Sequence, residues 1–342
     1  MKPIPAVSHL CDAIRELQRQ RVCNLKSRIM ISNRLVATVA TATGYHAGME
    51  DDERKKRFAK ASEVIARVKT DHNHETDSGA GLILATLPSI AAFDAMVDGY
   101  EKEMLKLAKQ LPVAAWVAKP EQRGFGLHSL ALIVGETGDL NNYAAPGKLW
   151  KRMGCAPYES HGEMKMPSTW RKSKPTLSAE EWTEIGYSPR RRSVAYLIGE
   201  GLMKQNFLTN GKADEYLIET DLPDATSRSS KAAKGAGKSQ RETEPSNAGP
   251  YRRRYDEAKA RAVEVHPDWC TPCETCKGKG KNKRGDKCSK CNGNGKAMAH
   301  AHNHAMLLCA KLLLKNLWVE WTGGDEVGGD TDTLSAPALC SV

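Results

Sequence analysis

Two Cys-x-x-Cys pairs near the C-terminal end constrain the fold of this chain more than any other feature. In "CETCKGKGKNKRGDKCSKCNGNGK", Cys273 and Cys276 form the first pair, Cys288 and Cys291 form the second, and a Gly-x-Gly element follows each pair. Four thiolates at this spacing match a closed tetrahedral zinc site, and the glycines let the backbone turn tightly around the sulfurs. A hairpin this small cannot bury a core, so we expect a structural zinc ion to replace one.

The other cysteines are scattered, which favours metal binding in a reducing compartment over a disulfide framework. Cys270 is a fifth thiol near the pairs, and we interpret it as a bystander. The N-terminal residues lack the apolar core of a signal peptide, and we identify no apolar run long enough to cross a bilayer. We therefore expect a cytoplasmic protein without membrane partners.

Residues 1–114 carry apolar side chains at alternating spacings of three and four, which predicts a mainly α fold that begins with a helical arm. We expect one helix from Ser8 to about Gly44, a second from Asp52 to about Lys69, and a third after Pro88. The apolar spacing is coiled-coil-like, so we expect the arm to mediate homo-oligomerisation. Acidic residues share one face of the third helix, and we interpret them as a solvated face rather than a metal site: Asp94, Asp98 and Glu101.

In residues 115–220, Gly124, Phe125 and Gly126 stand before an apolar helical run, with Arg123 just ahead of them. The pattern predicts two helices joined by a tight glycine turn, a helix-hairpin-helix whose turn amides hold a DNA phosphate without contacting bases. An αα-hairpin without a ligand is the alternative.

Arginine clusters begin two further predicted helices. Arg190, Arg191 and Arg192 follow a Ser-Pro helix start, where the helix dipole disfavours cations and an anion would stabilise them. The second cluster, Arg252, Arg253 and Arg254, adds non-specific affinity for nucleic acid. Lys and Arg outnumber Asp and Glu by 51 to 41, which indicates a polyanionic partner, although a solvated basic surface is an equal alternative.

The segment from Gly124 to Tyr158 resembles the C-terminal domain of insertion-sequence transposases of the one-ten family. The Gly-x-Gly turn, the run Gly135-Glu136-Thr137-Gly138-Asp139 and the Pro146-Gly147-Lys148-Leu149 helix start carry this resemblance. It implies a helical arm and a helix-hairpin-helix domain that follow a RuvC-like nuclease domain with a DEDD carboxylate set. No such strand-rich segment precedes the arm, so we expect the nuclease domain to be missing.

In the same family a serine after the glycine-proline element acts as nucleophile, and Ser160 is the nearest match here, with His161 beside it. A serine needs an activating base, so a plain loop serine is the alternative, and we expect the chain alone to lack catalysis. The zinc hairpin resembles the repeats of DnaJ-type chaperones.

The rest of the chain divides by composition. We expect a flexible linker over 221–250, a basic helix and the zinc hairpin over 251–296, a C-terminal docking helix over 297–321 and a disordered tail over 322–342. His300 and His304 share a face of the docking helix, and we interpret them as a satisfied pair rather than as metal ligands.

Together these features predict a transposase-related DNA-binding protein that contacts the DNA backbone and is associated with transposition or recombination. One alternative is an RNA-binding zinc-knuckle protein, because a basic arm and a zinc hairpin suit RNA equally well. The other is a chaperone-like interaction protein whose zinc hairpin binds unfolded chains.

Overall fold

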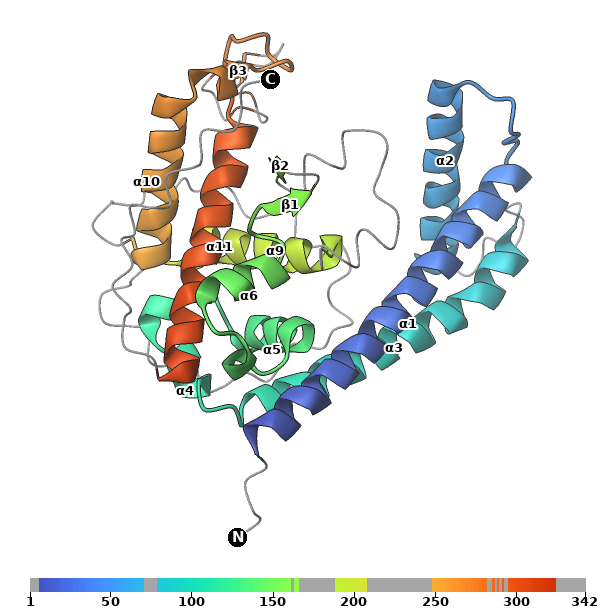
Figure 1. Cartoon of the computed structure of the whole chain (residues 1–342). Helices are drawn as coiled ribbons and strands as arrows, with labels where there is room; N and C mark the ends of the chain where they lie inside the picture. The colour runs from blue at the N-terminus through green and yellow to red at the C-terminus, as the bar shows by residue number, and fades with distance from the viewer. Residues whose placement is uncertain are drawn as a thin grey trace.

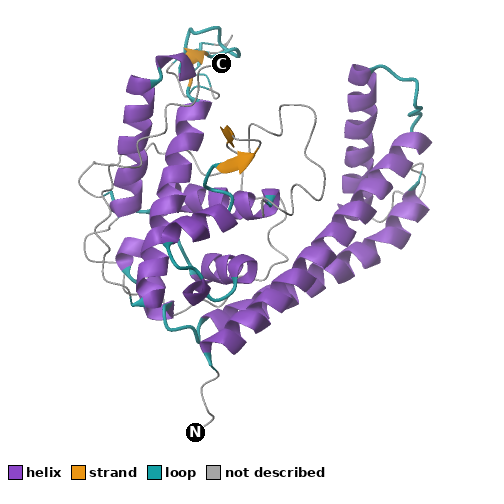
Figure 2. Ribbon diagram, viewed as in Figure 1, coloured by secondary structure: helices purple, strands orange, loops and turns teal. Residues whose placement is uncertain are grey.

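The computed structural model describes residues 6–70, 79–160, 163–165, 188–207, 248–281, 285–286, 288, 291 and 295–323. The prediction of a mainly α fold is confirmed, since the only strands among these residues form two short hairpins (Figures 1 and 2). The predicted linker, up to residue 247, and the predicted tail, from residue 324 onward, lie outside the described residues.

Three helices form the arm: α1 (Val7–Ala42), α2 (Asp51–Thr70) and α3 (Ala80–Ala108). α1 and α3 lie side by side along their length, and α2 packs against their far end (Figure 1). That end has its own small core, with Val39, Val64 and Ile83 fully or nearly buried. The near end of the arm adds Leu10, Ile14 and Met104 to the core of the next domain, so packing continues across the boundary placed at residue 114.

The third helix begins earlier than the sequence predicts, because Pro88 lies inside α3 and not ahead of it. Gly79, in the left-handed region with φ 90°, precedes its first turn. Proline removes one backbone donor, and the remaining hydrogen bonds together with packing on α1 carry the helix through. Two of the three residues interpreted as a solvated acidic face are ion-paired with α1: Asp94 with Arg28 at 2.9 Å and Glu101 with Arg21 at 2.6 Å.

The earlier start also corrects the expectation that no apolar run is long enough to cross a bilayer. By length and composition α3 is long and apolar enough, with a mean hydropathy of 1.7 over its most apolar window, of which 17% is buried. A single helix of this kind among the described residues is weak evidence for a membrane span, since core helices pass the same test.

The central domain follows the arm with short elements. These are α4 (Ala114–Val117), η1 (Pro120–Gln122), α5 (Leu127–Thr137), η2 (Leu140–Asn142), α6 (Pro146–Arg152), the hairpin β1 (Tyr158–Ser160) and β2 (Glu163–Lys165), and α9 (Pro189–Gln205). β1 and β2 pair antiparallel, with Ser160 opposite Glu163. α5 is the centre of this domain, because Leu130, Ile133 and Val134 are completely buried.

The last part of the chain returns to this domain. α10 (Pro250–Val265) and η5 (Pro267–Trp269) lead into the hairpin of β3 (Thr271–Pro272) and β4 (Lys296–Ala297), and α11 (Ala299–Thr322) runs back beside α10 (Figure 1). α11 covers nearly the whole of the predicted docking helix. Its Leu313 and Leu317 are fully buried, and the indole of Trp150 on α6 donates to the Lys311 carbonyl at 3.0 Å.

Asn206, at the end of α9, connects the glycine turn to the start of α10 by hydrogen bonds. Its buried amide donates to the carbonyls of Glu121 and Arg123 at 2.8 and 2.9 Å, and its oxygen accepts from the Tyr251 amide at 3.1 Å. The phenol of Tyr251 in turn donates to Gln122 at 2.7 Å. These bonds fix the start of α10 against the end of α9 and the turn that precedes α5.

Candidate functional site

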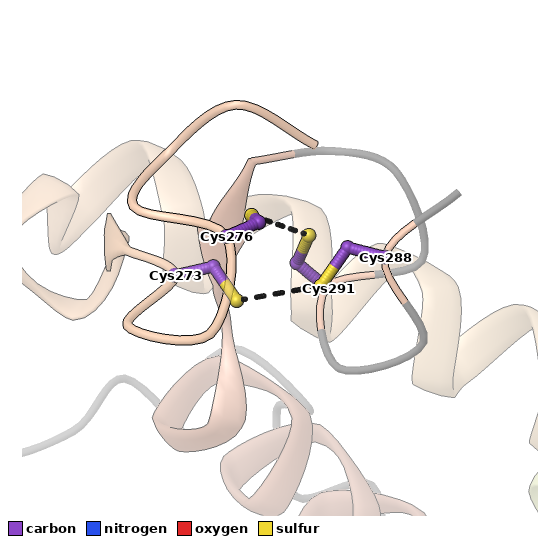
Figure 3. Close-up of side chains that lie close together, drawn as sticks. All are labelled: Cys273, Cys276, Cys288 and Cys291. Carbon is purple, nitrogen blue, oxygen red and sulfur yellow. Dashed lines mark hydrogen bonds between the residues drawn. The ribbon is translucent and has the colours of Figure 1, made fainter. Parts of the chain in front are cut away.

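The four paired cysteines converge at the end of the α10–α11 helix pair. All four are buried, and their sulfurs lie within 4.8 Å of one another (Figure 3). The Sγ atoms of Cys273 and Cys288 are 3.9 Å apart, and those of Cys276 and Cys291 are 3.6 Å apart. Zn–S bonds of ~2.3 Å in a tetrahedron place sulfurs ~3.8 Å apart. The spacing therefore fits a tetrahedral metal ion and is far too long for disulfides.

The backbone of the hairpin explains the glycines of the two Gly-x-Gly elements. Gly278, Gly280 and Gly295 have φ of 80°, 72° and 71°, in the left-handed region that glycine adopts without strain. A Cβ on Gly295 would collide with the carbonyl oxygen of Gly278, so the two elements cross at their backbones. The Cys273 amide donates to the Gly295 carbonyl at 2.8 Å, which closes the hairpin above β3 and β4.

Backbone hydrogen bonds and burial act in opposite directions on two of the thiols. The Gly280 amide donates to the sulfur of Cys276 at 3.2 Å. Backbone amides, that of Cys276 first, lower the pKa of Cys273 to about 7, whereas burial raises the pKa of Cys276 to about 11. With four sulfur donors no position is left for water or substrate, so a metal here would be structural rather than catalytic.

The neighbouring cysteine and histidines lie outside this group. Cys270 is half-buried and lies outside it. Across the described ranges no second set of three or more His, Cys, Asp or Glu side chains is arranged to hold a metal. His300 and His304 instead approach the ring of Trp269, at 6.1 and 5.6 Å between centroids, and Trp269 stacks on His266 at 4.2 Å. Burial lowers the pKa of His304.

The glycine turn lies between η1, a single 3-10 turn, and α5, so a full helix follows it but only the short elements α4 and η1 precede it. Phe125 is buried against Trp116 and so has no part in a surface contact. Gly124 has a φ of 96°, and a Cβ there would lie 2.7 Å from the Gly201 carbonyl oxygen of α9. Gly126 is the N-cap of α5, and open space surrounds the position of its missing Cβ. The special backbone at Gly124 is thus explained by close packing on α9, and Gly126 is the position open to an external group.

The three arginines at the start of α9 have acceptors within the chain. Arg190 donates to the carboxylate of Glu136 on α5 at 2.8 Å, and Arg191 lies 3.6 Å from the same oxygen. Arg192 donates to the carbonyl of Gly154 and stacks on the ring of Tyr196. Arg190 remains 44% exposed, so it is the member of the three that can also face solvent.

The arginines that begin α10 differ in exposure. Arg252 is paired with Asp256 at 2.8 Å and also donates to the Met203 carbonyl at 2.9 Å. Arg253 is exposed and Arg254 half-buried. Arg123, ahead of the glycine turn, is exposed and donates to the Phe207 carbonyl at 3.2 Å. Among the predicted DNA contacts that the structure describes, Arg253 is therefore the arginine whose exposed side chain we choose for the binding test below.

The predicted nucleophile, Ser160, ends β1 at the turn toward β2. Its neighbour His161, the one base considered for it, lies outside the described residues. The backbone position of Ser160 is that of a hairpin residue.

Sequence reasoning did not identify the group that organises the arginines. Glu136 interrupts the apolar run of α5 and its side chain is only 1% exposed. Gln18 of α1 donates to its other oxygen at 2.7 Å, and this is possible because Gly135 leaves room for the Gln18 side chain. A carboxylate within an apolar helical run was the available signal, since a buried charge requires partners.

No family model, no curated protein and no solved structure matches the chain. The resemblance to transposases of the one-ten family therefore stays a prediction.

Proposed function

We propose that this chain is a transposase-related, cytoplasmic DNA-binding protein that contacts the DNA backbone and carries a structural zinc ion. One observation carries the proposal. α9 and α10 both begin with proline, carry three consecutive arginines near their starts and have no acidic residue in the first turn. The positive end of the helix dipole disfavours cations, and a phosphate at such an end relieves that repulsion.

The exposed side chains of the metal hairpin also favour nucleic acid as the partner. Lys277, Lys279, Lys281 and Lys296 are exposed around the four cysteines, and the described hairpin residues expose no large apolar side chain. A chaperone-like surface for unfolded chains would require such apolar side chains. Nucleic acid is therefore the better partner, and the preference between DNA and RNA is an outcome of the experiment below.

Replacing Arg253 by Gln is expected to weaken binding of the full-length protein to duplex DNA several-fold. The salt slope of the binding constant is expected to become shallower by ~0.9, since one phosphate contact is lost. Titration of labelled duplexes of different sequence, at several salt concentrations, measures both quantities, and the loss should be equal for every sequence.

Arg19→Gln is the matched control, because Arg19 is an exposed arginine of the arm that is ion-paired with Glu16 at 2.8 Å. Structured RNA of equal length is titrated in parallel. Equal affinities of the original protein and of Arg253→Gln would contradict the contact at α10. Much tighter binding of RNA than of DNA would move the proposal to the RNA-binding alternative.

We further propose that the arm self-associates. The sequence from Gly79 to Phe93 contains no charged residue, and Leu82 and Met96 on α3 are 44% and 40% exposed. An uncharged face can pack against the same face of a second copy without like-charge repulsion. We therefore propose that a second copy of this chain covers it, in a two-fold symmetric dimer.

Leu82→Glu combined with Met96→Glu is expected to shift the protein from dimer to monomer at micromolar concentration, measured by light scattering. The helix content should stay unchanged, because both side chains lie on the outside of α3. A protein that is already monomeric before substitution would rule out this interface.

A further inference from the structure

Two histidines near the start of α11 lie in its contact with α10 and η5. The hydroxyl of Tyr255 on α10 and Nδ1 of His302 are hydrogen-bonded at 2.6 Å, and the two rings lie edge to face with centroids 5.7 Å apart. Tyr255 is 4% exposed. The Nδ1 of a neutral ring can accept a hydrogen bond from this hydroxyl, whereas both nitrogens of an imidazolium only donate. A proton on Nδ1 of His302 therefore takes an acceptor away from a buried hydroxyl.

The charged groups around His302 come from α10 and α9. Burial first, and then the positive charge of Lys259 on α10, lowers the pKa of His302. Lys204 on α9 acts in the same direction, and Glu200 on α9 opposes it. Glu200 is itself ion-paired with Lys204, so its charge is already used within α9.

The second histidine, His304, is half-buried where α11 meets η5. Its ring lies 5.6 Å from the ring of Trp269, whose indole stacks on His266 at 4.2 Å. Burial first, and then the charge of Lys311 on the same helix, lowers the pKa of His304. His266 at the end of α10 and Arg254 within it act in the same direction. A proton on His304 would therefore add a positive charge to a partly buried place whose charged neighbours are cations.

The sign of the resulting pH dependence follows from these directions. A histidine whose pKa is lower in the folded than in the unfolded chain releases its proton on folding. The folded state then loses stability as the pH falls below about 6.5, the pKa of an unperturbed histidine, and the loss continues down to the pKa of the folded state. Because both histidines join α11 to α10 or η5, this loss acts on the contact between these elements.

We propose that the contact of α11 with α10 and η5 is a proton-sensitive joint, in which protonation of His302 and His304 loosens α10 and η5 from α11. The metal hairpin connects η5 to α11, so its attachment to the rest of the domain depends on this joint. The joint requires no nucleic-acid partner, and it goes beyond the proposed function.

The test is hydrogen exchange of the full-length protein, followed by mass spectrometry of the peptide that covers α10, residues 250–265. The comparison variant combines His302→Gln with His304→Phe, because glutamine keeps a hydrogen-bonding group beside Tyr255 and phenylalanine keeps a ring beside Trp269. Between about pH 7.5 and about pH 5.5, the opening equilibrium constant of α10 should rise in the original protein, relative to this variant, by up to about tenfold for each histidine.

Comparison of the two proteins at the same pH cancels the effect of pH on the chemical exchange rate. Loss of metal from the cysteines in acid would affect both proteins alike, so it cannot produce the difference. The peptide that covers α2, residues 51–70, contains no histidine and should open equally in both proteins at each pH.

His300→Gln is the matched control, because His300 is an exposed histidine of the same helix whose ring lies 6.1 Å from that of Trp269. It should respond to acid like the original protein. If the double variant does not fold, His302→Gln alone replaces it and should remove the contribution of one histidine. An equal acid response of α10 in the original protein and in the variant that lacks the titrating rings would overturn the joint. A response of α2 as large as that of α10 would overturn it as well.

Discussion

Cys288→Ser is expected to reduce the zinc content of the purified protein from about one ion per chain to none. Cys288 is 1% exposed and its sulfur lies 3.9 Å from that of Cys273, and among the described residues the group holds four ligands and no fifth. With three thiolates left, the hairpin has neither a closed metal site nor a core of its own. Metal analysis by mass spectrometry measures the first effect, and limited proteolysis between residues 270 and 297 measures the second.

Cys270→Ser is the matched control, since Cys270 is half-buried and lies outside the group of four. It should keep the zinc ion and the protease resistance. The rest of the protein should stay folded in both variants, because α10 and α11 pack on each other and on α9 outside the hairpin. A Cys288→Ser protein that retains a full equivalent of zinc would show that the four sulfurs are not the site.

In the arm, the spacing of apolar residues predicts the first helix well and the start of the third helix poorly. Apolar spacing predicts a helix from Ser8 to about Gly44, and α1 spans Val7–Ala42. The predicted start of α3 is wrong, because a proline normally marks a helix boundary. Here Pro88 lies on the exposed side of a helix that packs on α1. Tertiary packing decides such a position, and periodicity within one helix contains no information about the neighbouring helix.

The cysteine group and the ion pairs of Glu136 also differ in how far the sequence alone predicts them. The four cysteines lie close together in the sequence, and their spacing alone predicts the group that the structure forms. Glu136 finds its partners at separations of 118 and 54 residues, in Gln18 and Arg190. Three arginines at a helix start indicate that an anion is needed, but only the fold shows that a carboxylate of the chain supplies part of it.

The glycine turn illustrates a further limit of sequence reasoning. A Gly-x-Gly pair predicts that the backbone is special, and it does not say whether a ligand or another helix approaches. Here the two glycines have separate roles. Gly124 approaches Gly201 of α9, where each glycine makes room for the backbone of the other, whereas Gly126 faces open space. Loss of DNA binding on replacing both glycines would therefore combine a folding defect with a binding defect.

Gly124→Ala is accordingly expected to destabilise the protein by about 3 kcal/mol. A φ of 96° is strained for any residue with a Cβ, at a cost of ~1–2 kcal/mol. The added methyl group would also lie 2.7 Å from the Gly201 carbonyl oxygen and 3.0 Å from the Leu202 Cα, backbone atoms that move only if α9 shifts. Urea unfolding followed by circular dichroism measures the difference in free energy of unfolding.

Gly126→Ala is the matched control. Its φ of −103° suits any residue and its Cβ position is open, so it should change stability by less than ~1 kcal/mol. If the two variants are equally stable, the close approach of the turn to α9 is not what fixes glycine at position 124, and a ligand at the turn becomes the better explanation.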